Sequence, residues 1–381
     1  MSLSTSEAVR YSRHLALREI GEAGQEKIKA ARVLLIGAGG LGSPSALYLA
    51  AAGVGTLGIV DDDRVDVSNL QRQVLYGSED VGELKAQAAS LRLQKLNPNV
   101  RVQAHATRLN AASVLNIVND YDIVLDGTDR FTTRYLSNDA CVLLGKPLVS
   151  AAIHRFEGQA LTYVPGQGPC YRCLFPEPPA DGLVPNCAEA GVLGVLPGVM
   201  GTIQATEALK LIIGAGELLV GRLLTYDALS LRFGEFRFAR RSDCAVCGDH
   251  PTITAPRDLP EACSANDLAA VERISPRTLQ TWMMSGSASK RVTVIDVREP
   301  QEFSVSRLPS AVNIPVNTLA ARIHELSNEE TTIFVCRSGA RSLTASGIAH
   351  RLGIASPVHL EGGMLAWQRE IDPTLDVAPA G

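Results

Sequence analysis

The chain has 381 residues, which is too long for one ordinary core and predicts two or three domains. Hydrophobic residues make up 46% of it and charged residues 20%, so it can form packed cores and is not a globally disordered chain. The formal net charge is -4 and no dense Lys/Arg run stands out, which argues against a nucleic acid or an anionic membrane as partner.

The N-terminal segment and the cysteines indicate the compartment. The start of the chain lacks the apolar core of a secretory signal, and apolar stretches such as 192–213 are interrupted by Gly and Pro. In a chain of this kind, close cysteine pairs favour metal binding, whereas single cysteines favour reactivity or burial. We therefore expect a cytoplasmic protein.

Strand and helix patterns alternate along the first part of the chain. Short apolar runs predict buried strands over residues 32–37, 55–60, 100–104 and 121–125. Helical patterns are predicted over residues 1–30, 43–52, 81–96 and 199–213. This alternation is typical of an α/β fold with a doubly wound sheet.

A change of texture separates a second domain. Residues 251–265 are polar and rich in proline, which is typical of a linker. Strand patterns resume over 292–296, 332–336 and 357–360, with a helix after Ser342. We therefore predict a first domain over 1–250 and a second α/β domain over 266–375.

The first strand runs into a glycine loop, Gly37-Ala-Gly39-Gly40-Leu-Gly42, that opens a helix. This G-x-G-x-x-G spacing lets the backbone approach a phosphate, and the helix N-terminus presents free N–H groups. Asp61 closes the second strand, 24 residues after Gly37, where a carboxylate can accept from ribose hydroxyls. Taken alone, the loop favours NAD or FAD, and a plain tight turn is the structural alternative.

Residues 61–73, DDDRVDVSNLQRQ, change that balance. They resemble the D-x-D-x-V-x-x-S-N-L-x-R-Q signature of the ubiquitin-activating-like enzymes. Lys85 and the pair Asp126 and Asp129 stand where that family keeps a Lys and a D-x-x-D. Within the family, the match from Arg10 to Cys247 resembles the molybdopterin-synthase adenylyltransferases (MoeB) and the thiamine-pathway enzyme ThiF.

The resemblance implies ATP and Mg²⁺ as cofactors and a Rossmann-like fold of the ubiquitin-activating type. Attack of a carboxylate on the α-phosphorus of ATP builds negative charge, which cations must meet. By resemblance, Arg72 and Lys85 neutralise the phosphates, Asn69 hydrogen-bonds them, Asp129 holds Mg²⁺ and Asp61 binds the ribose. The nucleotide-binding residues that it implies are Gly37, Gly39, Gly40, Gly42, Asp61, Asp63, Ser68, Asn69, Arg72, Lys85, Asp129 and Arg130.

Two further positions of this match concern the dimer and a departure from the family pattern. Arg13 resembles the family's N-terminal arginine that reaches into the partner subunit's site, which implies a homodimer. Arg130 stands where the family usually has Asn. It either adds a phosphate contact or points to solvent.

Two C-x-x-C pairs, Cys170/Cys173 and Cys244/Cys247, lie 70 residues apart. Four thiolates in two such pairs suit tetrahedral Zn²⁺, with no position left open for catalysis. The family carries a structural Cys₄ zinc at these positions. We therefore expect a structural zinc rather than disulfides or redox chemistry.

The other cysteines of the first domain are assigned by their surroundings. Cys187 lies in a segment, Pro185 to Gly198, that resembles the family loop with the catalytic thiol of ubiquitin-activating enzymes. It is either chemically essential or a loop thiol without a covalent task. Cys141 is predicted to be a core residue in a helix. The seven histidines form no metal or triad spacing and are assigned no role.

The second domain resembles a single-domain rhodanese in the order and spacing of its motifs. Cys336 ends a strand and opens a Gly/Ser loop into a helix, where N–H donors and two arginines stabilise a thiolate and a persulfide anion. Asp296 and Arg298 are expected to brace this loop, which comprises Cys336, Arg337, Ser338, Gly339, Ala340 and Arg341. Rhodaneses often show Gly-His-Ile-Pro-Gly where this chain has Ser306 to Ser310, which leaves substrate entry open.

The combined pattern predicts adenylylation of a small ubiquitin-fold sulfur carrier that ends in Gly-Gly. A Cys336 persulfide, loaded by a cysteine desulfurase or another donor, then supplies the sulfur for a thiocarboxylate. Molybdenum cofactor synthesis is the expected pathway, with thiamine synthesis or tRNA thiolation as alternatives. The rival functions are an NAD-linked oxidoreductase and a non-catalytic scaffold that binds the carrier.

Overall fold

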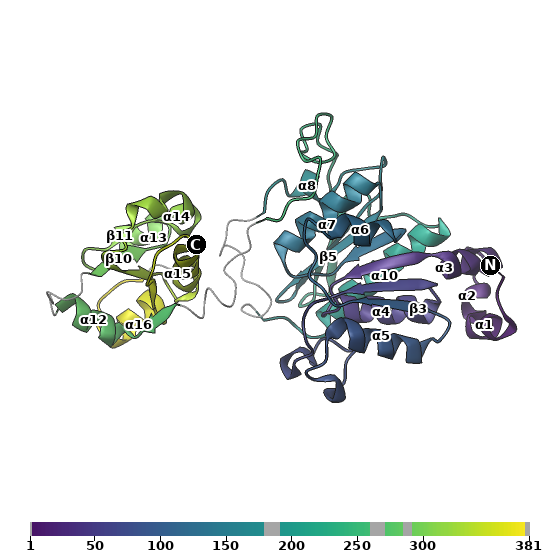
Figure 1. The fold of residues 1–381 in the computed structure, drawn as a ribbon, viewed down its shortest axis with the longest axis horizontal. Coiled ribbons are helices and arrows are strands. Elements are labelled where there is room, and N and C mark those ends of the chain that lie inside the picture. The colour runs from purple at the N-terminus through teal and green to yellow at the C-terminus, as the bar shows by residue number, and fades with distance from the viewer. Residues whose placement is uncertain (1, 179–190, 260–270, 285–291, 378–381) are drawn as a thin grey trace. The chain divides into compact units, whose positions relative to one another are not determined.

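The computed structural model describes residues 2–178, 191–259, 271–284 and 292–377, which divide between two compact units. Unit 1 ends at Leu259, and the described part of unit 2 begins at Val271. Figure 1 shows that each unit is a sheet with helices on its faces. None of the helices that the structure describes has both the length and the apolar surface that a bilayer span requires.

The sheet of unit 1 has eight strands in the order β3-β2-β1-β4-β5-β6-β7-β8. These strands are β1 (Arg32–Ile36), β2 (Thr56–Val60), β3 (Arg101–His105), β4 (Ile123–Asp126), β5 (Leu148–His154), β6 (Glu157–Tyr163), β7 (Arg222–Asp227) and β8 (Arg232–Arg237). The strands from β3 to β5 in this order are parallel, and β6, β7 and β8 add antiparallel pairs. The strand order reverses between β1 and β4, so a crevice for a ligand is expected at their carboxyl ends.

Helices cover both faces of this sheet (Figure 1). The helices that the structure describes in this unit are α1 (Thr5–Arg10), α2 (Ser12–Leu15), α3 (Gly21–Ala30), α4 (Gly42–Ala52), α5 (Lys85–Leu96), α6 (Val114–Asn119), α7 (Phe131–Leu144), α8 (Tyr171–Leu174) and α10 (Leu196–Ile213), with the 3₁₀ turns η1 (Val67–Asn69) and η2 (Ser78–Asp80).

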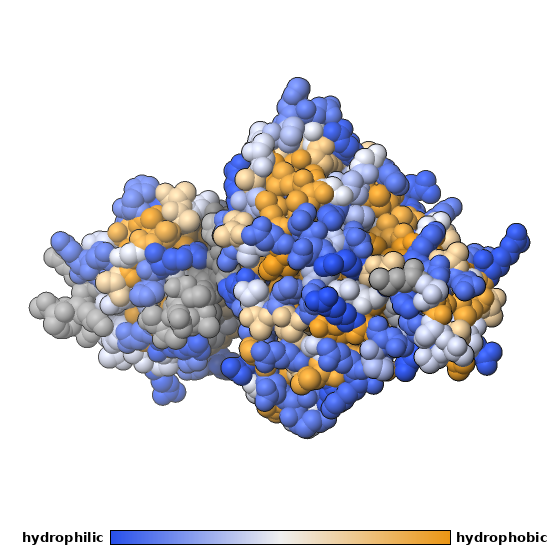
Figure 2. Space-filling model, turned by 45° about the vertical axis from the view of Figure 1, so that its right-hand side comes forward, coloured by the Kyte–Doolittle hydropathy of each residue, from blue (hydrophilic) through white to orange (hydrophobic). Residues whose placement is uncertain are grey.

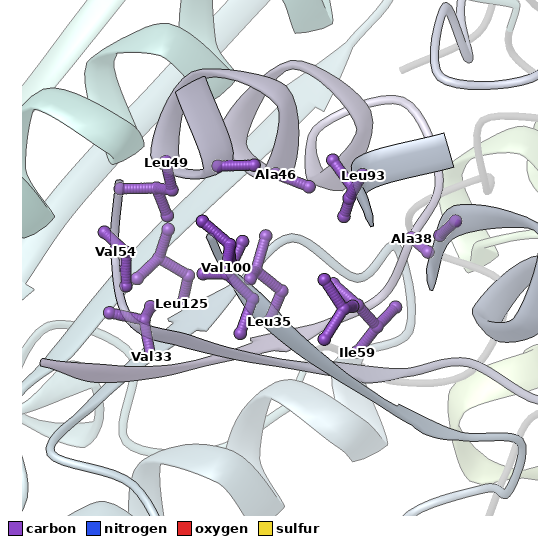
Figure 3. Close-up of a cluster of buried hydrophobic side chains, with 14 of the residues drawn as sticks. Val33, Leu35, Ala38, Ala46, Leu49, Val54, Ile59, Leu93, Val100 and Leu125 are labelled. Carbon is purple, nitrogen blue, oxygen red and sulfur yellow. The ribbon is translucent and has the colours of Figure 1, made fainter. Parts of the chain in front are cut away.

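The central strand shows how one sequence builds two cores. Val33 and Leu35 of β1 point to a cluster with α4, α5 and α10, whereas Leu34 and Ile36 point to a cluster with α6 and α7. Alternation along a strand produces this division. Figure 3 shows the first cluster, in which Leu49 of α4 and Leu93 of α5 lie against the strand side chains.

Two predicted helices are shorter in the structure. The N-terminal helical region is divided into α1, α2 and α3 rather than forming one helix. The helix predicted over 81–96 begins only at Lys85 because Gly82, with φ +90°, is bound to the preceding loop instead. Its N–H donates to Val65 O at 2.9 Å, and Glu83 O accepts from Val65 N–H at 2.9 Å.

The far edge of the sheet is open. All six residues of β8 are exposed, including Phe233 at 57% and Phe236 at 63%. Its hydrogen-bonded neighbour is β7. On the face drawn in Figure 2, hydrophobic side chains reach the surface in patches that hydrophilic side chains separate.

The start of the predicted linker is held by unit 1. Thr252 and Ile253 both donate their N–H groups to Ala245 O, at 2.9 and 2.8 Å. Ile253 is buried in the same hydrophobic cluster as Cys170, Cys173 and Cys244, and Asp258 accepts from Ala111 N–H at 2.7 Å.

Unit 2 is a smaller parallel sheet with the order β11-β10-β12-β13-β9. Its strands are β9 (Glu272–Ile274), β10 (Val292–Asp296), β11 (Val312–Asn313), β12 (Thr331–Val335) and β13 (Val358–Leu360). Its helices are α12 (Pro276–Met284), α13 (Pro300–Val305), α14 (Val316–Arg322), η3 (Ile323–Glu325), α15 (Ala340–Arg351) and α16 (Gly363–Glu370). The fully buried β12 is the middle strand and leads directly into Cys336.

Candidate functional sites

The glycine loop and the D-x-x-D motif (Asp126 to Asp129) meet at the carboxyl ends of β1 and β4. A Cβ on Gly37 would lie 3.2 Å from Thr128 Cγ2 and 3.3 Å from Gly127 O. Gly37 has φ +89°, and a Cβ on Gly42 would lie 2.0 Å from Gly37 O, so both positions require glycine. The structure therefore brings these two predicted motifs together at the point where the strand order reverses.

Two side chains fix the conformation of this loop. The half-buried carboxylate of Asp61 accepts the N–H of Ala38 at 2.8 Å and that of Asp63 at 2.9 Å. Burial raises the pKa of Asp61, although the charge of Lys85 and these two N–H groups act against the rise. The hydroxyl of Tyr76 donates to Ala38 O at 2.9 Å. Asp61 is thus tied to the loop through its carboxylate.

A carboxylate joins two cations beside the loop. Lys85 Nζ lies 3.0 Å from Asp63 Oδ2, and the Lys85 side chain is only 6% exposed. Arg130 approaches the other oxygen of Asp63 at 3.5 Å and Asp62 at 3.8 Å. Arg130 therefore lies over acidic side chains of the site, in contact with the same group as Lys85.

The residues of the 61–73 motif from Asp66 onward lie on η1 and beside it. Ser68 donates both its N–H and its hydroxyl to Asp66 Oδ1, at 2.8 and 2.6 Å, and its carbonyl accepts from Arg72 Nη1 at 3.0 Å. Asn69 O accepts the N–H groups of Arg72 and Gln73. The turn thus presents the Arg72 guanidinium near the surface.

The D-x-x-D motif divides into a buried and an exposed acid. Asp126 is fully buried and accepts the N–H and hydroxyl of Thr128 at 3.0 and 2.9 Å. Burial raises the pKa of Asp126, against the opposing charge of Arg134. Asp129 is exposed just before α7, where its carboxylate is open to solvent. A carboxylate so placed suits Mg²⁺, which prefers oxygen ligands.

Arg13 lies at the other end of α4 from the glycine loop. Its neighbour His14 bonds Gln25 at 3.0 Å, and Gln25 donates to the carbonyl of Ala52, the last residue of α4, at 2.8 Å. Eleven helical residues span about 16 Å. The exposed Arg13 is thus not brought to the glycine loop of its own chain.

The four predicted zinc cysteines come together. Their sulfur atoms all lie within 4.8 Å of one another, with Cys170 Sγ 3.7 Å from Cys244 Sγ and Cys173 Sγ 3.4 Å from Cys247 Sγ. A tetrahedron with Zn–S bonds of about 2.3 Å has edges of about 3.8 Å, so the thiols fit this ion. Cys141 is fully buried in α7, as predicted, and Cys187 falls outside the described residues.

Unit 2 holds Cys336 in a tight loop between β12 and α15. Cys336 is 1% exposed, and Gly339 donates its N–H to Cys336 Sγ at 3.1 Å. Gly339 is the N-cap of α15, with φ +98°, so the sulfur lies at the positive end of a helix. The carbonyl of Cys336 accepts the N–H of Met364 at 2.8 Å, which packs α16 against the loop.

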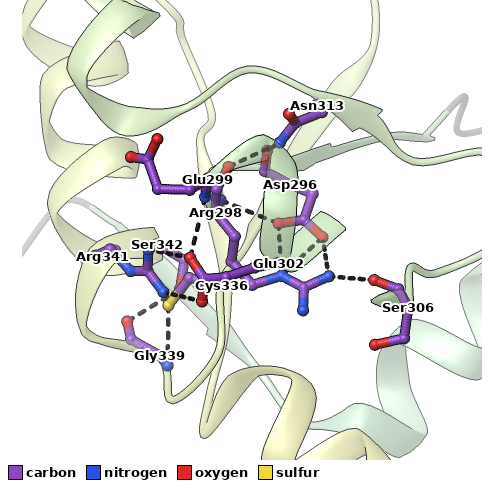
Figure 4. A network of polar contacts seen from close by, with 10 residues as sticks. All are labelled: Asp296, Arg298, Glu299, Glu302, Ser306, Asn313, Cys336, Gly339, Arg341 and Ser342. Carbon is purple, nitrogen blue, oxygen red and sulfur yellow. Dashed lines mark hydrogen bonds and ion pairs between the residues drawn. The ribbon is translucent and has the colours of Figure 1, made fainter. Parts of the chain in front are cut away.

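Two ion pairs lie near the Cys336 loop, one at the loop itself and one at the end of β10 (Figure 4). Arg341 makes a two-pronged pair with Glu302, with both distances 2.7 Å. The buried Arg298 pairs with Asp296 at 2.7 Å and donates to Ser306 O at 2.6 Å. Arg341 thus joins the Cys336 loop to α13, whereas Arg298 joins the end of β10 to the segment in which the rhodanese pattern departs.

The structure adds residues that the sequence did not single out. Gln73 is buried beside Gly39, and within the described part of the chain its Oε1 has no hydrogen-bond partner. Glu302 and Ser342 were likewise assigned no role from the sequence. His359 contacts Ser342 across the fold and has no sequence signal.

Comparison with known proteins assigns both units to families. Residues 11–246 match the ThiF family, and residues 279–370 match the rhodanese-like domain. The first match covers more than half of the chain.

Several relatives match nearly the whole chain. The probable adenylyltransferase/sulfurtransferase MoeZ of Mycobacterium tuberculosis is 44% identical, over 98% of this chain and 96% of that protein. The adenylyltransferase and sulfurtransferase MOCS3 of Culex quinquefasciatus is 41% identical, over 97% and 89%. The sulfur carrier protein adenylyltransferase of Thermus thermophilus is 54% identical over 66% of this chain and 95% of its own length.

Among solved structures, E. coli MccB with ATP is similar to the chain with a TM-score of 0.55 and 25% identity, covering 62% of this chain and 74% of that one. This likeness concerns the fold of the larger part of the chain. The chain belongs to the ThiF family and carries a rhodanese-like domain after its ThiF domain.

Proposed function

We propose that unit 1 adenylylates the C-terminal glycine of a small ubiquitin-fold sulfur carrier and that Cys336 of unit 2 then delivers sulfur to it. The observation that carries this proposal is the pairing of two sites in one chain. One is a nucleotide-type crevice with Lys85 in it, and the other is a thiol held at a helix N-terminus. A carboxylate accepts sulfur only after it has gained a leaving group, so the two sites form one sequence of reactions.

In the first step, the carboxylate of the carrier attacks the α-phosphorus of ATP and pyrophosphate departs. The charge that develops requires cations that are already in position. Lys85, Arg72 and Arg130 supply them, since Lys85 and Arg130 both lie at Asp63 and Arg72 is fixed on Ser68 O. The Gly37 to Gly42 loop and Asp61 hold the nucleotide, together with Gln73.

In the second step, the outer sulfur of a Cys336 persulfide attacks the acyl carbon and AMP leaves. The carrier is then joined to Cys336 through an acyl disulfide. A second thiol, either Cys187 or a cellular thiol, attacks the Cys336 sulfur and releases the carrier thiocarboxylate. This attack leaves Cys336 in a disulfide with the second thiol, and a further cellular thiol reduces that disulfide by exchange. A cysteine desulfurase or another persulfide donor then reloads the free Cys336 thiol, in the pathway to molybdenum cofactor, thiamine or thiolated tRNA.

Two metals belong to this proposal. Mg²⁺, with Asp129 as protein ligand, would neutralise phosphate charge at the crevice. Zn²⁺ in the four thiolates would be structural, because all four positions are taken by protein ligands. The zinc site joins the segment after β6 to the segment after β8.

We also propose that the active form is a homodimer in which Arg13 serves the partner's crevice. Arg13→Ala and Lys85→Ala variants would each be inactive, whereas a mixture exchanged into mixed dimers would regain about a quarter of the activity by random assortment. No recovery in mixed dimers confirmed by mass would refute the shared site.

The central test is ATP–pyrophosphate exchange with and without a carrier that ends in Gly-Gly. We expect carrier-dependent exchange in wild-type protein and in Cys336→Ala, with thiocarboxylate formation lost only in the variant. Absence of exchange with every carrier, in zinc-loaded folded protein, would remove the adenylylation claim. Bound pyridine nucleotide without exchange would instead favour the oxidoreductase, and carrier binding without ATP binding would favour the scaffold.

A further inference from the structure

The hydroxyl of Ser342 lies between the reactive sulfur and a buried histidine. Its Oγ is 3.5 Å from Cys336 Sγ, 2.9 Å from Gly339 O and 3.3 Å from His359 Nδ1. Ser342 is fully buried and His359, on β13, is 4% exposed. Ser346 keeps these elements in register, since its hydroxyl contacts the carbonyls of Ser342 and Val358 at 2.9 and 3.3 Å.

The hydrogen-bond donors and acceptors around Ser342 favour one tautomer of His359. A serine hydroxyl has one proton to donate and two lone pairs to accept with. Gly339 O can only accept, so Ser342 donates to it when Cys336 is a thiol. Both lone pairs are then filled if Cys336 S–H and His359 Nδ1–H donate to them. With the proton on Nε2 instead, Nδ1 and Gly339 O would compete for the single Ser342 proton.

Loss of the Cys336 proton changes the preference of the hydroxyl. The thiolate can only accept, and an ionised acceptor forms a stronger hydrogen bond than a carbonyl does. Gly339 O does not become unpaired when Ser342 turns away, because it also accepts the N–H of Leu343 at 3.1 Å. The thiolate would then have two donors, Ser342 Oγ–H and Gly339 N–H.

We propose that His359 is a positioning residue which donates its Nδ1 proton to Ser342 and so leaves the Ser342 hydroxyl free to turn to the Cys336 thiolate. This role rests on the proposed sulfur transfer at Cys336 and extends it to residues outside the loop.

The charges around the histidine are consistent with a neutral ring. Burial lowers the pKa of His359, the charge of Arg273 on β9 lowers it further, and Glu361 after β13 acts in the opposite direction. A neutral ring carries one N–H, so its tautomer decides whether Ser342 receives a donor. Arg341, in the same loop as Cys336, is paired with Glu302.

The test is the pH profile of Cys336 alkylation by iodoacetamide in the full-length protein, followed by mass spectrometry of the Cys336 peptide. We expect His359→Leu and Ser342→Ala to move the midpoint of the alkylation profile upward by about one pH unit. Below the midpoint this shift makes alkylation about tenfold slower. His359→Asn, whose amide can donate near the Nδ1 position, should restore the wild-type profile. The double variant Ser342→Ala/His359→Leu should match Ser342→Ala alone, because the two residues act in series.

His324→Leu, at an exposed histidine of the same unit, is the matched control and should leave the profile unchanged. A wild-type midpoint in His359→Leu, or equal shifts in His359→Leu and His359→Asn, would overturn the proposal. If the leucine variant does not fold, the ¹⁵N shifts of the ring in wild-type protein decide, since a bare Nδ1 contradicts the proposed donor. Sulfur transfer from thiosulfate to cyanide is measured separately, so its absence in wild-type protein would count against the proposed function and not against this contact.

Discussion

Gly363 offers a direct test of how closely α16 packs on the sulfur loop. Gly363 has φ +59°, and a Cβ there would lie 2.3 Å from Cys336 O and 2.8 Å from Arg337 O. Because ordinary contact begins at 3.4 Å, Gly363→Ala must displace the loop backbone by about 1 Å. The left-handed conformation costs about 1–2 kcal/mol and the overlap about 1–3 kcal/mol, so the free energy of unfolding of unit 2 should fall by about 2–5 kcal/mol.

Gly353 provides the matched control in the same unit. It has φ +98°, and among the described atoms a Cβ there would meet nothing within 4 Å. Gly353→Ala therefore carries the strain of about 1–2 kcal/mol alone. Since a 1 Å misplacement costs on the order of a hundredfold in rate, we expect sulfur transfer to fall about that much in Gly363→Ala and to stay within about twofold in Gly353→Ala. Equal transfer by the two folded variants, measured from thiosulfate to cyanide with pyrophosphate exchange as internal control, would refute this reasoning.

Three further predictions concern the crevice, the cysteine cluster and the loop support. Lys85→Ala should lower pyrophosphate exchange by about 10²-fold or more, whereas Lys95→Ala, exposed on the same helix, should not; similar rates would contradict the assigned role. Cys247→Ser should abolish stoichiometric zinc and lower the melting temperature of unit 1 while sulfur transfer persists; full zinc by metal analysis would exclude the four-thiolate site. Burial alone would raise the pKa of Glu302, but its hydrogen bonds from Arg341 and Glu299 N–H hold it below the ordinary 4.5. The Glu302 carboxylate therefore stabilises unit 2 at neutral pH, and this stabilisation is lost as the pH falls below about 4.5. In Glu302→Gln, the free energy of unfolding from urea titrations should change less between pH 7 and 3 than in wild-type protein; an equal change would contradict this.

Local patterns in the sequence predicted the parts of the fold that depend on short-range rules. The short continuous apolar runs located the strands that became β1 and β2, and the glycine spacing located the turn after β1. The broken N-terminal helix was missed because the helical pattern alone does not show where a helix is interrupted. The late start of α5 was missed because hydrogen bonds that join Val65 to Gly82 and Glu83 override helical propensity there.

The roles of the predicted site residues remain proposals. Their positions in the structure show which contacts can be predicted from the sequence and which cannot. The cysteine pairs converge as their spacing indicated, because thiol pairs at this spacing have few other uses. The partners of Arg130 could not be predicted, since they depend on how the end of β4, which Arg130 follows, is placed beside the end of β2, which Asp62 and Asp63 follow. The contact of His359 with Ser342 depends likewise on the pairing of β13 with β12 and on α15 above it.

The exposed strand β8 has a consequence for motion in unit 1. It pairs with β7 and buries none of its six residues, whereas β1 is paired on both sides and covered on both faces. Amide hydrogen exchange should therefore follow a gradient, fastest in β8 and slowest in β1, because local opening begins where few apolar contacts are lost. The opening of β8 is limited at its C-terminal end, where the chain continues into Cys244 and Cys247 and so into the cysteine cluster. Strand fraying at this edge thus reports on how firmly that cluster is closed.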